Sequence, residues 1–317
     1  TAIIQHSYYT NDMTKTTTVI IEFDHVTKKF GSFAAASDIA LTVQAGEVVG
    51  FVGENGAGKT TTINMLLGFT SPSQGAVRLF GKPVRTSNAH VSHRSIGYAS
   101  GDMALPDHMT GEQFIRFTMA QTAGDHDKRY EELVDAFKPK LDKKNSTLSR
   151  GNKQKIALVA AFVTSPKLIV LDEPTSGLDP VMQDVFLDTI RDVAKRGGTV
   201  FMSSHYLQEV AEVGTRVLLM KQGKIMEDLS AEQLQQRGGK IVTITTKHAV
   251  TLPKNNVVEP TSGRHGGYHR TEFGFTGEPS QLVKWLGGLT GVIDVSITDR
   301  TLEHEFRSVY ESEAGNV

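Results

Sequence analysis

A glycine-rich segment that ends in a lysine and a threonine holds the residue types best suited to phosphate chemistry. It reads Gly53-Glu54-Asn55-Gly56-Ala57-Gly58-Lys59-Thr60 and follows the short apolar run 47–52. Glycine lets several backbone N–H groups converge on phosphate oxygens, and the helix expected from about Lys59 adds partial positive charge. We predict that Lys59 reaches the β- and γ-phosphates of a nucleotide and that the Thr60 hydroxyl coordinates Mg²⁺. The alternative is a chance glycine turn, which the expected strand before and helix after it argue against.

Two carboxylates, Asp172 and Glu173, follow the apolar run Leu168-Ile169-Val170-Leu171. A continuous apolar run of this length is typical of a strand that is buried on both faces in a parallel sheet. At the end of such a strand, Asp172 would hold Mg²⁺ and Glu173 would polarise the water that attacks a phosphate. Taken alone, the pair is equally compatible with two carboxylates that cap a strand.

Further segments lie in a definite order around these two sites. They are Phe30 upstream of the glycine loop, Leu148-Ser149-Arg150-Gly151-Asn152, Ser176-Gly177-Leu178-Asp179, and Ser203-Ser204-His205. With the glycine loop and the carboxylate pair, they resemble motifs of the ATP-binding cassette (ABC) family: the aromatic residue that stacks on adenine, the signature, the D-loop and the switch histidine. The resemblance covers about residues 19–230 without a gap.

The resemblance implies a role for each matching residue. It assigns Glu173, His205 and Lys59 to catalysis, and Thr60 and Asp172 to Mg²⁺. Ser149, Gly151 and Asp179 would contact ATP that is bound to a second subunit. Without the family context, Phe30 would be an ordinary core residue, His205 an ordinary histidine and Ser149 a helix N-cap. The ATP-binding residues of the chain's own site would be Phe30, Gly53, Glu54, Asn55, Gly56, Ala57, Gly58, Lys59, Thr60 and Thr61.

The sequence departs from the family pattern at two places. Arg150 and Asn152 replace the usual glycine and glutamine of the signature. Gly101, in Ile96-Gly97-Tyr98-Ala99-Ser100-Gly101, occupies a position where the family usually has glutamine or glutamate, a side chain that touches Mg²⁺ near the membrane partner. Asp102 is the nearest substitute. This second departure puts the coupling role of the loop at Gly101 in doubt.

The elements that must position these residues predict an α/β fold. Apolar strands over 47–52, 167–171 and 199–203 alternate with helices over 59–67 and 184–195, as in a sheet covered by helices. The resemblance specifies a P-loop nucleotide-binding core with a mixed sheet and a helical subdomain over about 90–165. Residues 231–317 form a small α+β appendix with expected strands at 241–245 and 292–297, a polar loop at 263–267, and helices at 281–286 and 302–310.

Composition limits the function classes. The 317 residues contain 34 Lys plus Arg, 35 Asp plus Glu and no cysteine, which excludes disulfides and thiolate chemistry and gives no overall basic charge for nucleic acid. No apolar run approaches the length of a membrane span. Residues 1–18 are polar, without the apolar segment of a signal peptide, and residues 1–12 are expected to be an extension with no role in the fold.

The resemblance is strongest to prokaryotic exporter ATPases of the multidrug and bacteriocin type. It implies a homodimeric, Mg²⁺-dependent ATPase at the cytoplasmic face of the membrane, bound to a separately encoded permease. ATP would close the dimer and hydrolysis would open it, and no nucleic acid partner is expected. The alternatives are an importer ATPase, an ABC ATPase acting on a non-transport partner such as the ribosome or DNA, and a regulator that binds nucleotide without hydrolysing it.

Overall fold

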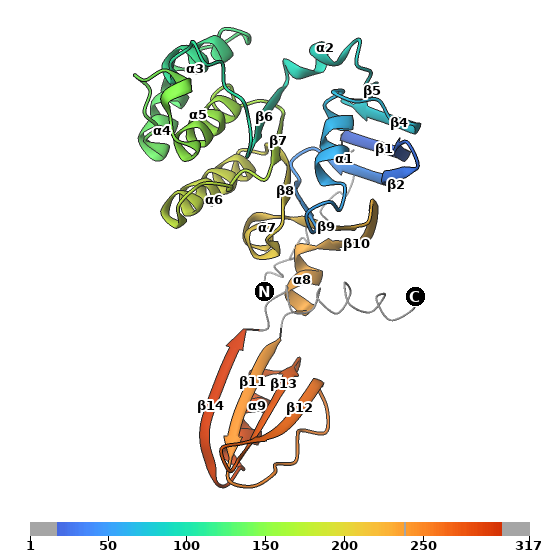
Figure 1. Ribbon diagram of the computed structural model, residues 1–317, viewed down its shortest axis with the longest axis vertical. Helices are drawn as coiled ribbons and strands as arrows, with labels where there is room; N and C mark the ends of the chain where they lie inside the picture. The colour runs from blue at the N-terminus through green and yellow to red at the C-terminus, as the bar shows by residue number, and fades with distance from the viewer. Residues whose placement is uncertain (1–17, 238, 300–317) are drawn as a thin grey trace, which may run out of the picture.

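The computed structural model describes residues 18–237 and 239–299 (Figure 1). The extension expected at 1–12 and the helix expected at 302–310 lie outside these residues. Within them, no helix is both long and apolar enough to cross a membrane. The mixed α/β fold class is confirmed.

A six-stranded sheet in the order β10-β9-β3-β8-β7-β6 forms the centre of the N-terminal part. Neighbouring strands from β9 through β3, β8 and β7 to β6 pair in parallel, and β10 adds an antiparallel edge. Strands β3, β7 and β8 are buried along their whole length, as their apolar runs predict. The strands are β3 (Val48–Val52), β6 (Ile96–Ser100), β7 (Leu168–Asp172), β8 (Thr199–Ser204), β9 (Arg216–Lys221) and β10 (Lys224–Ser230).

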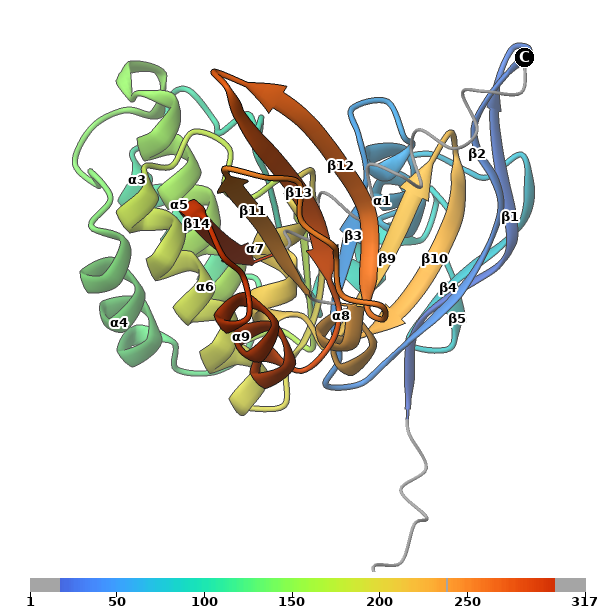
Figure 2. The ribbon, with the colours of Figure 1, turned by 90° about the horizontal axis from the view of Figure 1, so that it is seen from below.

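A second, antiparallel sheet lies beside the first in the order β2-β1-β4-β5. Helix α1 (Lys59–Leu66) shares one apolar core with both sheets, in which Ile63 and Leu66 join Ile21 and Phe51 (Figures 1 and 2). This packing fixes the start of α1 against the end of β3. The strands of the second sheet are β1 (Val19–Phe30), β2 (Phe33–Gln44), β4 (Gln74–Leu79) and β5 (Lys82–Pro83).

Helices gather on the other side of the central sheet around a separate core, to which Ile115, Phe137, Ile156 and Phe186 belong. The range 90–165 also contains strand β6, which pairs with β7 and belongs to the central sheet. Helix α6 begins at Pro180, earlier than predicted, because the Asp179 side chain caps it and proline suits the first turn. The helices on this side are α3 (Gly111–Met119), α4 (Asp127–Phe137), α5 (Arg150–Phe162), α6 (Pro180–Lys195) and α7 (Leu207–Val213). The short helix α2 (Ala89–His93) lies instead near the end of α1, where His93 Nε2 is 2.7 Å from the carbonyl oxygen of Leu67.

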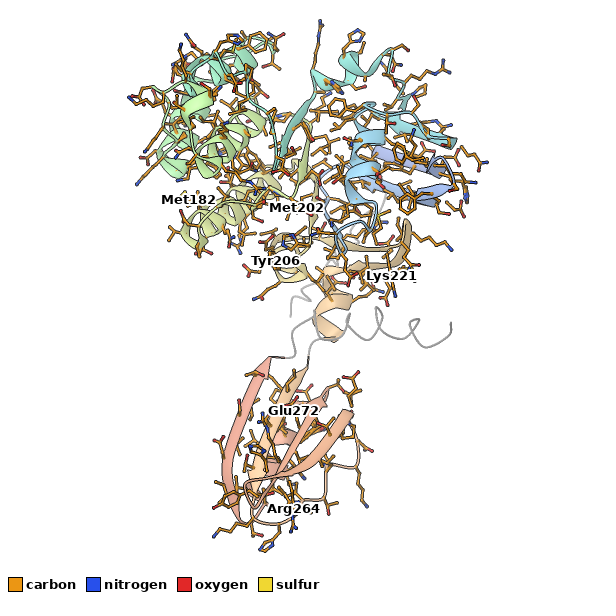
Figure 3. All side chains as sticks on the ribbon, viewed as in Figure 1. Met182, Met202, Tyr206, Lys221, Arg264 and Glu272 are labelled. Atoms are coloured by element: carbon orange, nitrogen blue, oxygen red, sulfur yellow. The ribbon has the colours of Figure 1, made fainter. Side chains whose placement is uncertain are left out.

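The C-terminal sheet, as we call β11 to β14 here, is antiparallel in the order β12-β13-β11-β14 and follows helix α8 (Ala231–Arg237). Helix α9 (Pro279–Gly287) covers the side chains of Val242, Ile244 and Phe273. The prediction of a polar loop at 263–267 was wrong, because residues 263–265 continue β12. Only Gly266-Gly267 make the turn, at φ 60° and 87°. Figure 3 shows Arg264 at the end of this sheet far from the rest of the molecule. The strands are β11 (Lys240–Thr246), β12 (Val257–His265), β13 (Tyr268–Phe275) and β14 (Val292–Asp299).

Candidate functional site

The glycine loop joins β3 to α1, and its glycines are required by close packing. A Cβ atom on Gly53 would lie 2.3 Å from the carbonyl oxygen of Met220, and one on Gly58 would lie 2.2 Å from that of Ala35. Gly58 also has φ 107°, a conformation that other residues rarely adopt. The loop therefore keeps its shape only with these glycines, and that shape places the start of α1 at its mouth.

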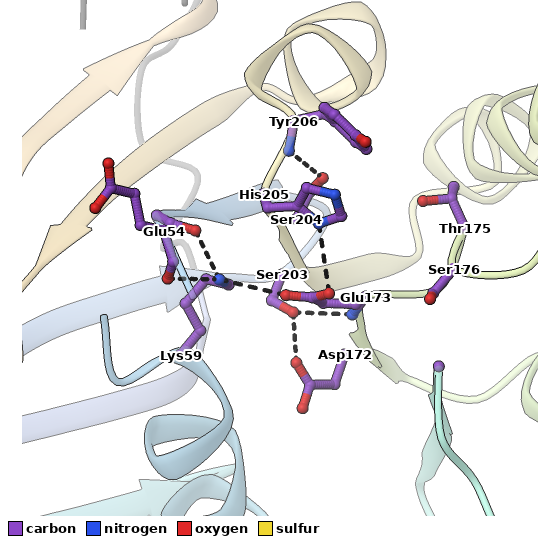
Figure 4. A network of polar contacts seen from close by, with 12 residues as sticks. Glu54, Lys59, Asp172, Glu173, Thr175, Ser176, Ser203, Ser204, His205 and Tyr206 are labelled. Carbon is purple, nitrogen blue, oxygen red and sulfur yellow. Dashed lines mark hydrogen bonds and ion pairs between the residues drawn. The ribbon is translucent and has the colours of Figure 1, made fainter. Parts of the chain in front are cut away.

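Lys59 is 4% exposed, and its ammonium group is held by three oxygen atoms. Lys59 Nζ donates to the carbonyl oxygens of Gly53 at 2.6 Å and Glu54 at 3.2 Å, and it lies 3.3 Å from Glu173 Oε1 (Figure 4). A buried charge needs such partners. The glycine loop and the strand end that carries Glu173 therefore meet at one cation, which is the group that an anionic ligand would contact.

A cavity of about 250 Å³ opens at this point. Phe30 is not among the residues that line it, whereas Phe33, across the β1–β2 turn, is. Both rings are exposed on the surface, Phe30 by 55% and Phe33 by 62%. Sequence analysis missed Phe33, although the short turn between the two rings was a usable signal. The cavity is lined by Phe33, Ala35, Asn55, Gly56, Gly58, Lys59, Thr60, Thr61 and Glu173.

Asp172 ends β7, is 5% exposed, and is fixed by a serine from the next strand. Ser203 Oγ donates to Asp172 Oδ1 at 2.6 Å and accepts a hydrogen bond from the backbone N–H of Glu173 at 2.9 Å. Asp172 and Ser203 face each other in the parallel register of β7 and β8. Sequence analysis did not assign Ser203 a role, and the shared strand-end position was the signal for one.

Glu173 lies between Lys59 and His205, with one carboxylate oxygen toward each. Its Oε2 is 3.4 Å from His205 Nδ1, and its Oε1 faces Lys59 (Figure 4). The backbone of Glu173 has φ 50°, an uncommon conformation outside glycine. Such strain concentrates at functional sites, where the surrounding contacts hold it. The structure thus brings together three residues that lie far apart in the sequence.

Glu209 connects the loop after Glu173 to the end of β8, directly before His205. Its Oε2 accepts hydrogen bonds from Thr175 Oγ1 at 3.1 Å and Ser204 Oγ at 2.9 Å. Burial raises the pKa of the Glu209 carboxyl, while the hydrogen bonds from Ser204 and Thr175 partly oppose that rise. Sequence analysis missed Glu209, because nothing in the spacing shows that one α7 side chain reaches both Thr175 and Ser204.

Ser149, Gly151 and Asp179 do not line the cavity at Lys59 within the same chain. Ser149 is the N-cap of α5 and Asp179 the N-cap of α6, where their side chains accept hydrogen bonds from Asn152 N and Met182 N. Ser149 and Asp179 are both exposed. Both helix starts therefore present a surface on which a second molecule could place an anion.

In this fold a glycine loop leads from a parallel strand into a helix, and a buried lysine faces a carboxylate at the end of another strand. These features define a nucleotide-binding domain. Comparison with known proteins gives the family: residues 36–176 match the family model described as ABC transporter. The Nod factor export ATP-binding protein I of Burkholderia lata is 32% identical over 86% of this chain and 91% of its own length. The chain belongs to the ATP-binding proteins of ABC transporters, and its family resemblance is confirmed.

Another relative agrees with this assignment, and solved structures share the fold. The bacitracin transport ATP-binding protein of Enterococcus faecalis is 28% identical over 80% of each chain. The fold is similar to a solved ATP-binding subunit of an ABC transporter, with a TM-score of 0.64 and 24% identity over 69% of this chain and 92% of that one. It is also similar to a dimeric ATP-binding cassette solved with ADP and Pi, with a TM-score of 0.61 and 21% identity over 67% of this chain and 99% of that one.

Proposed function

We propose that this chain hydrolyses ATP with Mg²⁺ and powers an exporter whose membrane-spanning part is a separate chain. The observation that carries the proposal is the position of Glu173 between Lys59 and His205 at the mouth of the glycine loop. The phosphates of ATP would lie on the loop N–H groups and on Lys59. Glu173 would then take the proton of the attacking water, and His205 would orient Glu173.

The residues present fit a magnesium ion. The Thr60 hydroxyl lines the cavity, and the Asp172 carboxylate is fixed at a strand end by Ser203. Magnesium prefers oxygen ligands and usually keeps only one or two from protein beside phosphate and water. When bound, the ion would neutralise charge on the phosphates. Phe30 stays the proposed adenine contact, with Phe33 as a second candidate from the cavity itself.

We place ATP between two copies of the chain, with Ser149, Gly151 and Asp179 of one copy over the ATP of the other. The exposed helix starts at Ser149 and Asp179 support this arrangement, because a γ-phosphate can accept hydrogen bonds from helix N-termini. ATP that contacts both copies would stabilise the closed dimer, and hydrolysis would remove that link.

A cavity of about 400 Å³ between the central sheet and the helices is our candidate for permease contact. Its lining includes Tyr98 and Met103, on either side of the loop at Gly101, and Phe114 of α3. The lining also includes polar side chains such as His93, Arg94 and Gln121, so a partner segment there would meet both apolar and polar groups. A chain docked there would lie at the cytoplasmic face of the membrane.

Export rather than import is favoured by the relatives. One is named for Nod factor export and another for bacitracin transport, and the first matches nearly its whole length. The alternative is an ABC ATPase that acts on a non-transport partner such as the ribosome. Co-purification with a hydrophobic partner in detergent supports the transporter, and co-sedimentation with ribosomes supports the alternative.

We assign ATP chemistry to residues 19–230 and an accessory role in regulation or partner contact to residues 231–317. The C-terminal sheet has its own apolar core and contains none of the nucleotide motifs. Truncation after Arg237 should leave basal ATP turnover intact and alter dimerisation or stimulation by the permease. Loss of nucleotide binding in the truncated chain would contradict this division.

Turnover by the Glu173→Gln variant tests the proposed reaction. Loss of a general base lowers the rate by about 10²–10⁴-fold. The variant should still bind ATP and should accumulate as an ATP-bound dimer, which size-exclusion chromatography would detect. Near wild-type turnover would contradict the role of Glu173.

A mixture of Lys59→Ala and Ser149→Arg chains tests the shared site. In a mixed dimer both lesions fall on one ATP site and the other site is intact, so the mixture should regain part of the activity that each variant lacks. Activity that stays at the level of the separate variants, with a rate strictly proportional to chain concentration, would contradict the shared site.

A further inference from the structure

The two departures from the family pattern, Arg150 and Gly101, meet in the folded chain. Arg150 Nη2 donates to Asp102 Oδ1 at 2.8 Å, to Ser176 Oγ at 2.9 Å and to the carbonyl oxygen of Gly101 at 3.4 Å. One guanidinium group therefore joins three segments: the start of α5, the loop after β6 and the loop after Glu173. Arginine suits such a position, because its donors are arranged in a rigid planar fork.

The absence of a side chain at Gly101 is part of the same arrangement. A Cβ atom there would lie 2.8 Å from the carbonyl oxygen of Glu173 and 2.9 Å from Ser176 Cβ. The Gly101 N–H donates to the carbonyl oxygen of Asp172 at 2.8 Å. The loop after β6 thus packs backbone against backbone on the residues of the carboxylate pair, which leaves Asp102 free to meet Arg150.

The start of α5 also packs closely on the loop after Glu173. A Cβ atom on Gly151 would lie 2.8 Å from the carbonyl oxygen of Gly177, and one on Gly177 would lie 3.4 Å from Arg150 Cγ. The stem of Arg150 therefore lies along Gly177 while its head reaches Ser176. If α5 moves, the segment between Glu173 and Gly177 must move with it, or these contacts break.

We propose that Arg150 is a positioning residue that makes the two ATP sites of a dimer cooperate. The inference rests on the proposed function, in which Ser149 and Gly151 contact the partner's ATP while Glu173 acts in the chain's own site. Arg150 follows Ser149 directly and holds the loop that begins at Glu173. ATP on the partner would therefore order α5 and, through Arg150, the hydrolytic loop of the same chain, so that filling one site prepares the other.

The contact is suited to control rather than to stability. The side chains of Arg150 and Asp102 are 59% and 90% exposed, and exposed ion pairs add little to the free energy of unfolding. Loss of Arg150 should therefore leave the melting temperature unchanged. Its effect on turnover would then reflect the position of the loop and not the amount of folded protein.

Steady-state hydrolysis by Arg150→Gln, Arg150→Lys, Asp102→Asn and the Arg150→Gln/Asp102→Asn double variant tests the proposal. Arg150→Gln should lower kcat about fivefold, which corresponds to about 1 kcal/mol, and bring the Hill coefficient for ATP toward 1. ATP affinity, measured where the chain is monomeric, should not change. Arg150→Lys should recover part of the loss. The double variant should resemble Arg150→Gln, because Arg150→Gln already removes the ion pair that Asp102→Asn would weaken.

Arg191→Gln is the matched control, because Arg191 is a half-buried arginine that pairs with Asp188 and Glu212 and does not line the cavity. Arg191→Gln should behave as wild type. A wild-type Hill coefficient of 1, an unaltered Arg150→Gln variant, or additive effects in the double variant would overturn the role of Arg150. Failure of the proposed function itself would be visible separately, as a wild-type chain without ATP turnover or a Glu173→Gln variant with full turnover.

Discussion

The N-terminal part, residues 19–230, and the C-terminal sheet both have buried apolar cores, but they differ in what else they bury. The first buries the charged side chains of Lys59 and Asp172, at 4% and 5% exposure. In the described C-terminal sheet, the buried polar residues are Thr246 and Thr271, both uncharged. Burying a charge is costly unless partners hold it, so charged groups stay buried where their chemistry is needed.

The difference extends to the backbone. Around the cavity, Gly53 and Gly58 allow contacts that any side chain would block, and Glu173 adopts φ 50°. In the C-terminal sheet, the turn at Gly266-Gly267 has open space around both glycines. Close packing at the cavity fixes the shape of the glycine loop, whereas the hairpin needs its glycines only for their backbone conformation. The comparison predicts that substitutions at the cavity will mainly lower ATP turnover. Substitutions in the core of the C-terminal sheet will instead lower the stability of that sheet.

The largest effect is expected for Lys59→Ala. The variant loses the one side-chain cation that lines the described cavity. Removal of a preorganised electrostatic contact typically lowers the rate by about 10²–10³-fold, and nucleotide affinity should fall as well. Binding of labelled ATP and phosphate release measure both effects. Lys195→Ala, an exposed lysine at the end of α6, is the control; if both variants retain wild-type binding and turnover, the cavity is not the ATP site.

Ser203→Ala should have the next largest effect on turnover. It removes the 2.6 Å hydrogen bond to Asp172 and the acceptor for Glu173 N–H, and it leaves two polar groups without a partner in a buried site. Such losses cost about 1–3 kcal/mol, so we expect about tenfold slower turnover at saturating Mg²⁺ and a higher Mg²⁺ requirement. Thr189→Ala is the control, since this buried hydroxyl bonds only within its own helix to Val185. Equal rates for the two variants would contradict the positioning role of Ser203.

Phe273→Ala should have a large effect on the C-terminal sheet and none on ATP turnover. Phe273 is 1% exposed and packs edge-on against Trp285 with ring centroids 5.4 Å apart. Loss of a buried phenylalanine costs about 3–5 kcal/mol. Because Trp285 is the one tryptophan of the chain, its fluorescence during urea unfolding reports on this region. A parallel fall in ATP turnover would show that the two regions depend on each other, against the comparison drawn here.

The smallest effect is expected for Glu209→Gln, as a change in the pH dependence of stability. The pKa of Glu209 is raised above its ordinary value of 4.5, so the folded chain binds this proton more tightly than the unfolded chain. The free energy of unfolding therefore falls as pH rises through the window from about 4.5 up to the folded pKa. The variant lacks this titration and should gain relative to wild type across that window, whereas Glu232→Gln, at an exposed position, should not. Urea unfolding at several pH values measures the difference, and parallel curves for wild type and Glu209→Gln would contradict it.

Short motifs were sufficient to predict the local structure around the glycine loop and the carboxylate pair. The spacing from Gly53 to Thr60 requires a tight loop before a helix, and the structure has that loop between β3 and α1. The apolar run before Asp172 predicted a fully buried strand, and β7 is one. These features are local, because glycine conformations, capping and apolar runs depend on neighbours in the sequence.

Contacts between distant segments were decided only by the tertiary structure. Ser203 meets Asp172 because β7 and β8 pair in a particular register, and Glu209 reaches both Thr175 and Ser204 because α7 packs beside them. The contact between Arg150 and Asp102 likewise requires α5 to lie against the loop after β6. The sequence by itself determined the identity of the chemical groups and the local shape of the loop that holds them. The fold decided which groups lie within hydrogen-bond distance, because register and helix packing depend on the whole core and not on any one motif.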